Sequence, residues 1–283
     1  MKRIGLSVCI FLSCYCFAWA QSEEGNSWST NEATLIGIGG YNVKDTYLSP
    51  YQYMGWGLRV LNERMKMVKL GDHHFSRQQV LNIDISFTDN PAETASDFSG
   101  FIDYTLAYHY RLFPPVENLK VLVGPAARAD LGFIYNTRNG NNPAAAKAGI
   151  DFNLSAMAIY TWYIKNYPLT IRYQLETPFM GAMFAPHYGQ SYYEIFDLGN
   201  YKGVVSFVSF HNQLAFRNYV TVDFSIGNFT IRAGFLNTSY RTHIHEIKSR
   251  ILSNSFMIGF VKEFVSFSGK RLKNQHQYAS AYY

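Results

Sequence analysis

Polar and apolar residues alternate one by one along much of this chain, and this alternation restricts the fold more than any other feature. From 101 to 112 every second residue is apolar, beginning with Ile102, and the residues between them are polar or small, beginning with Asp103. A strand places alternate side chains on opposite faces, whereas a helix would scatter both sets around its circumference. This segment is therefore predicted to be a β-strand with one apolar and one polar face.

The same pattern recurs, with turn signals between the runs. Gly227-Asn228 separates two alternating runs, as in a two-residue hairpin, and Asp89-Asn90-Pro91 and 136–143 have loop composition. The segment 181–201 is also predicted to be a loop, and two weaker, glycine-containing strands precede the clear ones at 33–43 and 53–60. The clear alternating runs are 80–88, 101–112, 121–133, 150–162, 169–176, 208–217, 220–226, 229–235 and 255–260.

These runs predict an all-β fold, an antiparallel up-and-down transmembrane β-barrel. The segment 236–253 fits either one bent strand or parts of two, so the strand count is about twelve, with ten as the alternative. Both chain ends lie on one side of such a barrel only when the number of strands is even.

Alternation alone does not say which face points outward, because a soluble barrel alternates too. Three features favour lipid outside: several runs exceed the ~9–11 residues of a membrane-crossing strand, aromatic residues lie near run ends, and acids and bases are mixed on the polar face. That face is predicted to form a paired network that fills the lumen. Its predicted members are Asp84, Asp103, His109, Arg111, Arg128, Asp130, Arg172, Glu176, His211, Asp223 and Arg232.

The start of the chain has the anatomy of a cleaved secretory signal peptide. Lys2 and Arg3 precede the apolar run 4–17, and Ala18-Trp19-Ala20 is a small-x-small cleavage site. The sequence therefore divides into a signal peptide (1–20), an N-terminal periplasmic segment (21–32), an outer-membrane barrel (33–267) and a polar C-terminal tail (268–283).

Composition excludes several other kinds of protein. Cys9, Cys14 and Cys16 all lie in the signal segment, so the mature chain has no thiol ligand, disulfide or cysteine nucleophile, and the flanking residues disfavour a lipid anchor. Removing Lys2 and Arg3 leaves 23 of the 25 basic residues against 20 acidic ones, which is no nucleic-acid signature. Aromatic residues form 17% of the chain, as interfacial girdles require.

Candidate chemistry is sparse. His187 and Ser191 share the loop 181–201 with Glu194, so the residue types of a serine hydrolase are present without a motif. The competing interpretation is a loop ordered by its tyrosines and stacked over the barrel mouth. His243 and His245 are two residues apart, but with no third ligand in the pattern we expect no metal, and no sequence motif indicates a cofactor.

The signal segment, the cysteine-free barrel pattern and residues 184–194 (FAPHYGQSYYE) together resemble Gram-negative outer-membrane barrels, in particular uncharacterised barrel families of the Bacteroidota. This resemblance implies an outer-membrane location, with outer-membrane lipids, lipopolysaccharide and the barrel-assembly machinery as partners. It implies no reaction. We therefore expect a structural, binding or narrow-pore protein, with a lipid-modifying hydrolase and a soluble periplasmic lipid-binding barrel as the alternatives.

Overall fold

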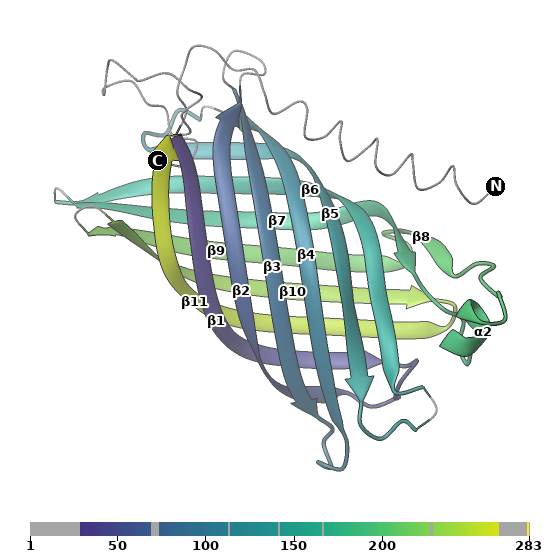
Figure 1. Ribbon diagram of the computed structural model, residues 1–283. Helices are drawn as coiled ribbons and strands as arrows, with labels where there is room; N and C mark the ends of the chain where they lie inside the picture. The colour runs from purple at the N-terminus through teal and green to yellow at the C-terminus, as the bar shows by residue number, and fades with distance from the viewer. Residues whose placement is uncertain are drawn as a thin grey trace.

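The structure, a computed structural model, describes residues 29–68, 74–112, 114–140, 142–165, 167–226, 229–265 and 282. These residues form a barrel of antiparallel strands with one short helix at one end (Figure 1). The elements are β1 (Ser29–Asp45), β2 (Tyr53–Val68), β3 (Phe75–Asp89), β4 (Ser96–Leu112), β5 (Leu119–Asn136), β6 (Ala144–Ile164), β7 (Tyr167–Phe184), α2 (Tyr192–Phe196), β8 (Val205–Ser209), β9 (Gln213–Ile226), β10 (Phe229–Ile244) and β11 (Ile247–Val265).

Ten strands close the barrel. Neighbours in sequence pair with each other, β1 pairs with β11 at the seam, and β9 follows β7 around the wall. This is the smaller of the two counts that the sequence allows. The ambiguous segment holds the end of β10 and the start of β11, which are joined by a tight turn in which His245 and Glu246 have φ values of 49° and 67°. Positive φ at both central residues is the geometry of a two-residue hairpin turn.

The eleventh strand, β8, is a short addition rather than a barrel stave. It pairs with the end of β7, where Met180 lies opposite Ser209, whereas β9 pairs with the preceding part of β7, where Glu176 lies opposite Arg217. Residues 210–212 form a turn between β8 and β9. The run 208–217, predicted as one strand, is therefore interrupted, because alternation by itself does not show where a strand leaves the sheet.

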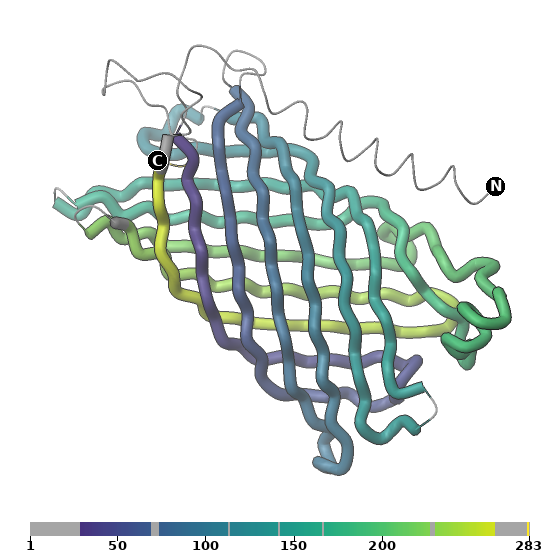
Figure 2. Tube along the Cα trace, viewed as in Figure 1, coloured from purple at the N-terminus to yellow at the C-terminus, as the bar shows by residue number. Residues whose placement is uncertain are grey.

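The first strand begins at Ser29, before the predicted barrel boundary at residue 33, because its polar start shows no alternation. β1 then bends around the barrel (Figure 2). Gly39 lies in this strand, and a Cβ there would come within 2.1 Å of the Asn254 carbonyl oxygen, so glycine permits the close approach of β11. The predicted signal peptide, 1–20, lies outside the described residues, and of the predicted tail, 268–283, only Tyr282 is described.

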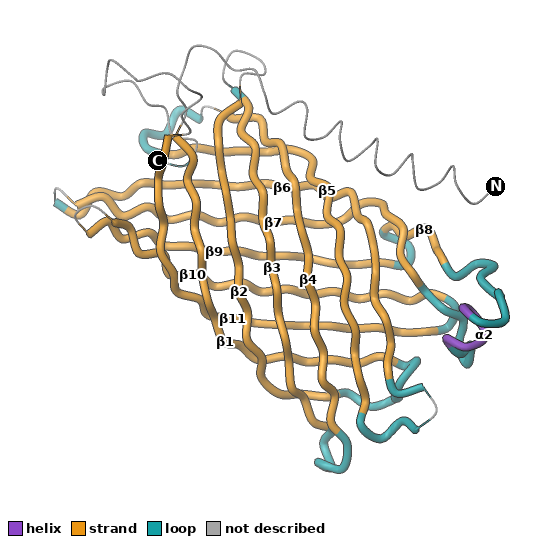
Figure 3. The backbone as a smooth tube through the Cα atoms, in the orientation of Figure 1, coloured by secondary structure: helices purple, strands orange, loops and turns teal. Residues whose placement is uncertain are grey.

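The two ends of the barrel differ. We call the end that holds Ser29 and Val265 the terminal end; β2, β4, β6 and β9 end there, and β3, β5, β7 and β10 begin there. The opposite, loop end carries 46–52, 90–95, 137–143, 245–246 and the long segment 185–204 with α2, and these described connections are drawn in teal toward the bottom and right of Figure 3. Among the described residues no helix is long and apolar enough to cross a membrane.

Polar side chains face the lumen and large apolar side chains face outward. On β3, Asp84 is buried between Ile83, which is exposed, and Ile85, which is partly exposed. On β4, Asp103 is buried and Ile102 and Tyr104 are exposed. Apolar residues also enter the lumen, mainly in a cluster of Ala33, Leu35, Leu61, Val80, Tyr219, Leu236, Met257 and Val261.

Candidate functional site

The terminal-end half of the lumen is crossed by a closed set of ion pairs, the Glu63 cluster, formed by Glu63, Arg172, Arg232 and Asp223. Arg172 donates through Nη2 to Glu63 Oε2 at 2.9 Å, and Arg232 donates through Nη1 to the same oxygen at 3.0 Å. Arg232 also forms two 2.7 Å hydrogen bonds to the two carboxylate oxygens of Asp223. All four side chains are buried, and two acids balance two bases, as buried charges require.

A chain of neutral side chains extends the cluster. Gln78 donates to Glu63 at 2.5 Å and to Gln174 at 2.9 Å, and Gln174 donates to Ser155 Oγ at 3.0 Å. His109 Nε2 lies 3.0 Å from the same hydroxyl. Histidine and serine are thus adjacent but buried, so His109 extends the hydrogen-bonded filling of the lumen, with no access from solvent.

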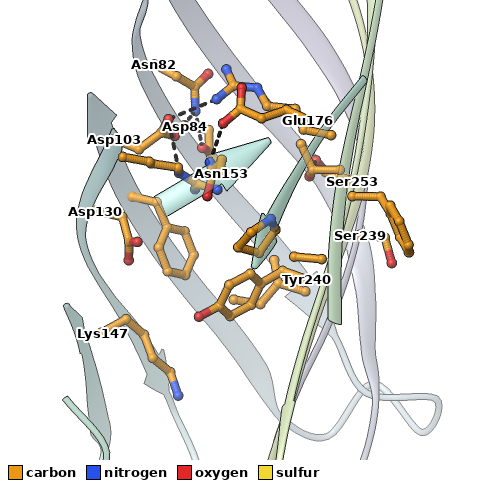
Figure 4. Close-up of a pocket in the computed structure, with 18 of the residues that line it drawn as sticks. Asn82, Asp84, Asp103, Asp130, Lys147, Asn153, Glu176, Ser239, Tyr240 and Ser253 are labelled. Carbon is orange, nitrogen blue, oxygen red and sulfur yellow. Dashed lines mark hydrogen bonds and ion pairs between the residues drawn. The ribbon is translucent and has the colours of Figure 1, made fainter. Parts of the chain in front are cut away.

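The loop-end half is hollow. A chamber with about 890 Å³ of space between atoms, its open mouth included, is lined by acids and bases together with Phe101 and Tyr240. Figure 4 shows its labelled lining residues from Asn82 to Ser253. Asp103 accepts a hydrogen bond from Arg217 Nη1 at 3.0 Å, and Arg128 Nε lies 3.5 Å away. The charged residues that line the chamber are Arg59, Arg128, Lys147, Arg217, Asp84, Asp103, Asp130 and Glu176.

The chamber lining therefore carries as many basic as acidic groups, but they are less completely paired than those of the Glu63 cluster. Glu176 accepts a hydrogen bond from the amide of Asn153 rather than from a cation. Asp130 is partly exposed, and no hydrogen bond or ion pair joins it to the rest of the described chain. The mixed and incompletely paired charges of this lining suit water and small polar solutes.

A lid, residues 185–204, folds over the loop end. Tyr47 donates its hydroxyl to the Gln190 carbonyl at 2.7 Å, and the Tyr192 hydroxyl accepts from the Ala146 amide at 2.6 Å. Burial, followed by the neighbouring Tyr192 and Asp45, raises the pKa of Tyr47 to about 12, so its hydroxyl remains a donor at neutral pH. The tyrosines thus hold the lid over the mouth, as the competing interpretation of this loop predicts.

A second, smaller hollow lies under the lid, with about 360 Å³ of space between atoms, its opening to solvent included. Lys147 and Met183 line both this hollow and the chamber. The ammonium of Lys147 pairs with buried Asp45 at the same end. The loop end is thus hollow below the lid, whereas the terminal end is filled.

The predicted pair His187 and Ser191 lies in the lid without a mutual hydrogen bond among the described residues. The Ser191 hydroxyl accepts from the Glu194 amide at 3.2 Å, and the Glu194 carboxylate accepts from the Ser191 amide at 3.1 Å. This reciprocal capping box begins α2. His187 instead stacks on His245, with ring centroids 3.9 Å apart. Ser191 and Glu194 therefore serve to start a helix.

The structure places most of the predicted lumen residues inside the barrel. Asp84, Asp103, Arg128, Asp130 and Glu176 line the chamber, Arg172, Asp223 and Arg232 belong to the Glu63 cluster, and His109 borders it. Arg111 is half-buried near the terminal end. His211 is misplaced by the prediction: it lies exposed in the turn between β8 and β9, where its Nδ1 is 2.6 Å from Ser209 Oγ.

The prediction also misses Glu63, on which the largest ion-pair cluster depends. The lumen face of β2 carries Leu61, Glu63 and Met65 in succession, so apolar residues on the polar face conceal the alternation. An acid between two apolar neighbours of the same face is the signal available in the sequence. Among the described residues no group of three potential metal ligands is gathered; His243 is the penultimate residue of β10, and His245 lies in the turn that follows this strand.

A family model described as "Protein of unknown function (DUF3316)" matches residues 5–271, and the chain belongs to this family. None of the curated proteins matches. Among solved structures, the chain is similar to the transport unit of the autotransporter AIDA-I from Escherichia coli, at 10% identity and a TM-score of 0.47, covering 87% of this chain and 92% of that one.

Two further structures are similar at lower scores. The translocator domain of the autotransporter NalP from Neisseria meningitidis has 10% identity and a TM-score of 0.37, with 91% of this chain and 96% of that chain covered. An outer-membrane channel from Pseudomonas putida F1 has 10% identity and a TM-score of 0.37, with 86% and 97% covered. Similarities this distant do not indicate an activity for the chain.

Proposed function

We propose that this member of the DUF3316 family is an integral barrel of the outer membrane that keeps its lumen closed, and that it binds small polar solutes in the chamber below its lid. One observation carries the membrane part of the proposal. The barrel turns its large apolar side chains outward and its charged side chains inward. That arrangement favours lipid around the barrel and polar contents within it.

The exposed fractions support this distribution. Ile36 on β1 is 63% exposed, Leu131 on β5 60%, and Phe256 and Phe260 on β11 71% and 68%. In water, so large an apolar surface would drive aggregation. A soluble lipid-binding barrel carries its apolar face inside, which is the reverse of what is found here.

The Glu63 cluster supports a closed lumen. Its members come from β2, β7, β9 and β10, so the bonds reach across the interior rather than along one wall. Ion flow needs a continuous path of water, and buried groups bonded to one another leave none at this level. A resting barrel of this kind is a binding protein rather than an open pore.

The remaining parts of the proposal concern the envelope. Long connections of outer-membrane barrels lie outside the cell, which favours an extracellular lid. Tyr188, Tyr193 and Tyr201 are exposed on it and suit contact with lipopolysaccharide headgroups. The proposal also includes the cellular context. The chain is exported by a signal peptide, residues 1–20, that is then cleaved, and the barrel-assembly machinery inserts it into an outer membrane of the Bacteroidota type.

The lipid-modifying hydrolase is less well supported by the site. A nucleophile needs a base within hydrogen-bonding distance, and the Ser191 hydroxyl is instead the cap of α2. His187 faces another imidazole. Purified protein is expected to release no fatty acid from phospholipid or lipopolysaccharide, and lipid release that Ser191→Ala abolishes would restore the enzyme interpretation.

Site-directed labelling tests the membrane part of the proposal. In the mature chain, which contains no cysteine if residues 1–20 are removed, Ile258→Cys on the exterior should react with a lipid-soluble maleimide and Asp130→Cys in the chamber should not. Outer-membrane fractions and a heat-modifiable band on a gel should accompany this result. Recovery of the protein in the soluble periplasm, or the reverse labelling, would contradict the membrane assignment.

Conductance and binding test the closed lumen and the chamber. Protein reconstituted in planar bilayers should show no stable unitary conductance, and a steady open channel would overturn the closed state. For the chamber, a panel of small zwitterions and organic acids can be titrated by calorimetry against wild type and Arg217→Gln. Binding that Arg217→Gln weakens supports the chamber as a site, and no binding by any of the panel contradicts it.

A further inference from the structure

Tyr282, the penultimate residue of the chain, lies inside the barrel, with 0% of its surface exposed. Its hydroxyl is 2.9 Å from Thr221 Oγ1 on β9. Its main-chain carbonyl accepts a hydrogen bond from Lys120 Nζ, near the terminal end of β5, at 3.3 Å. Both its side chain and its backbone are therefore held by the barrel wall.

The ring of Tyr282 lies over two arginines of the Glu63 cluster. The guanidinium carbon of Arg232 is 4.3 Å from the ring centroid, and that of Arg172 is 5.2 Å away. The ring of Tyr219 lies 4.6 Å from Arg172 as well, so both tyrosines contact this guanidinium. A cation and the aromatic ring below it attract each other most strongly where water is excluded.

An apolar collar surrounds the same ring. Tyr282 packs in one buried cluster with Met65, Met67, Leu122, Met157 and Ile159. Methionines adapt their shape to an occupant because their side chains are unbranched and flexible. Apolar walls, two cations on the ring and a hydroxyl partner for the phenol are together the features of a site for a para-substituted phenol.

We propose that the terminal-end half of the lumen is a binding site for phenolic groups, and that Tyr282 fills it in cis as a plug. The rest of the tail tethers the plug, so its effective concentration at the site is high and it rebinds readily after leaving. When Tyr282 leaves, the site accepts another phenol or the C-terminal tyrosine of another peptide. Water then reaches the Glu63 cluster from the terminal end.

This inference goes beyond the membrane proposal and does not depend on it, because it is tested on full-length mature protein folded in detergent micelles. The variant is Tyr282→Gly, and the probe is p-cresol, which is the tyrosine side chain cut at Cβ. A cavity made by removing a buried side chain can bind a small molecule of the same shape. We expect p-cresol to bind Tyr282→Gly and to raise its unfolding temperature, and not to bind the wild type.

The chemical class is tested by comparing p-cresol with toluene, which lacks the hydroxyl. A hydrogen bond of roughly 1 kcal/mol corresponds to an affinity about five-fold lower for toluene. In the double variant Thr221→Val with Tyr282→Gly, the advantage of p-cresol should disappear. Equal affinities in Tyr282→Gly itself would contradict a phenol site.

Tyr188→Gly serves as the matched control, since Tyr188 is an exposed tyrosine of the lid. It should leave the unfolding temperature unchanged and bind no p-cresol. If Tyr282→Gly fails to fold, carboxypeptidase digestion of folded wild type replaces it: Tyr282 should be released far more slowly than from urea-unfolded chain. Release at equal rates, or an unchanged unfolding temperature in Tyr282→Gly with no p-cresol binding, would overturn the proposal.

Discussion

The two halves of the lumen use similar residues in different ways. In the terminal-end half, the charges of the Glu63 cluster are balanced and hydrogen-bonded, and an apolar layer with Tyr282 adjoins them. In the loop-end half, the charges of the chamber surround open space, and Asp130 has no bonded partner in the described chain. The difference teaches that a polar lumen face can specify either a seal or a cavity, depending on how completely its groups pair.

The largest effect on stability is expected in the Glu63 cluster. Glu63→Ala leaves two buried guanidinium groups without their shared carboxylate, so we expect a loss of about 3–5 kcal/mol in the free energy of unfolding. Asp130→Ala, in the chamber, should cost less than Glu63→Ala, because no hydrogen bond or ion pair joins Asp130 to the rest of the described chain. Urea unfolding of protein reconstituted in lipid vesicles measures both. Equal losses in the two variants would abolish the distinction between the halves.

On the exterior, an equivalent substitution should cost the same stability in both halves, because lipid surrounds both of them in the proposed arrangement. Ile36 on β1 and Leu131 on β5 are exposed to nearly the same extent. Arginine at either position should cost about 2–4 kcal/mol if the site lies near the bilayer midplane, and less toward the interfaces. The same unfolding measurement applies. If neither variant loses stability, the exterior does not face hydrocarbon.

The two tyrosine hydrogen bonds that hold the lid control access to the chamber at the loop end. Tyr47→Phe and Tyr192→Phe each remove a hydrogen bond worth roughly 1 kcal/mol, which corresponds to about a five-fold change in an opening equilibrium. In the doubly substituted protein, a water-soluble thiol reagent should therefore label Asp130→Cys faster. The rate at which Ser155→Cys is labelled, next to the Glu63 cluster, should stay unchanged. An equal increase at both positions would show that the lumen is continuous.

The smallest effect concerns Ser191. Loss of an N-cap costs about 1 kcal/mol, and α2 is short and peripheral, so Ser191→Ala should loosen the lid without lowering the stability of the barrel. Hydrogen exchange at the Glu194 amide should increase several-fold, while exchange in β2 and β7 stays the same. Ser191→Asp keeps a capping oxygen and is the matched control. Unchanged exchange at Glu194 in Ser191→Ala would show that the cap does not order the lid.

Local alternation was sufficient to predict most of the strands and the faces of their side chains. Asp103 and Ile102 are neighbours on one strand, so their opposite orientations follow from the geometry of that strand alone. The same reasoning predicted a ten-strand alternative and a loop over the mouth. It was wrong at His211, because the interruption between β8 and β9 is a change in sheet pairing that alternation does not record.

Only the tertiary structure decided which groups meet inside. Glu63 meets Arg172 and Arg232, which lie more than a hundred residues away along the chain. These contacts depend on the number of strands, their tilt and the register at the seam. No single segment of the sequence determines any of these three properties. The place of Tyr282 depends on the same closure. The sequence by itself therefore determined which side chains point inward, and the closed barrel determined their partners, because orientation is a property of one strand and contact across a lumen is a property of all ten.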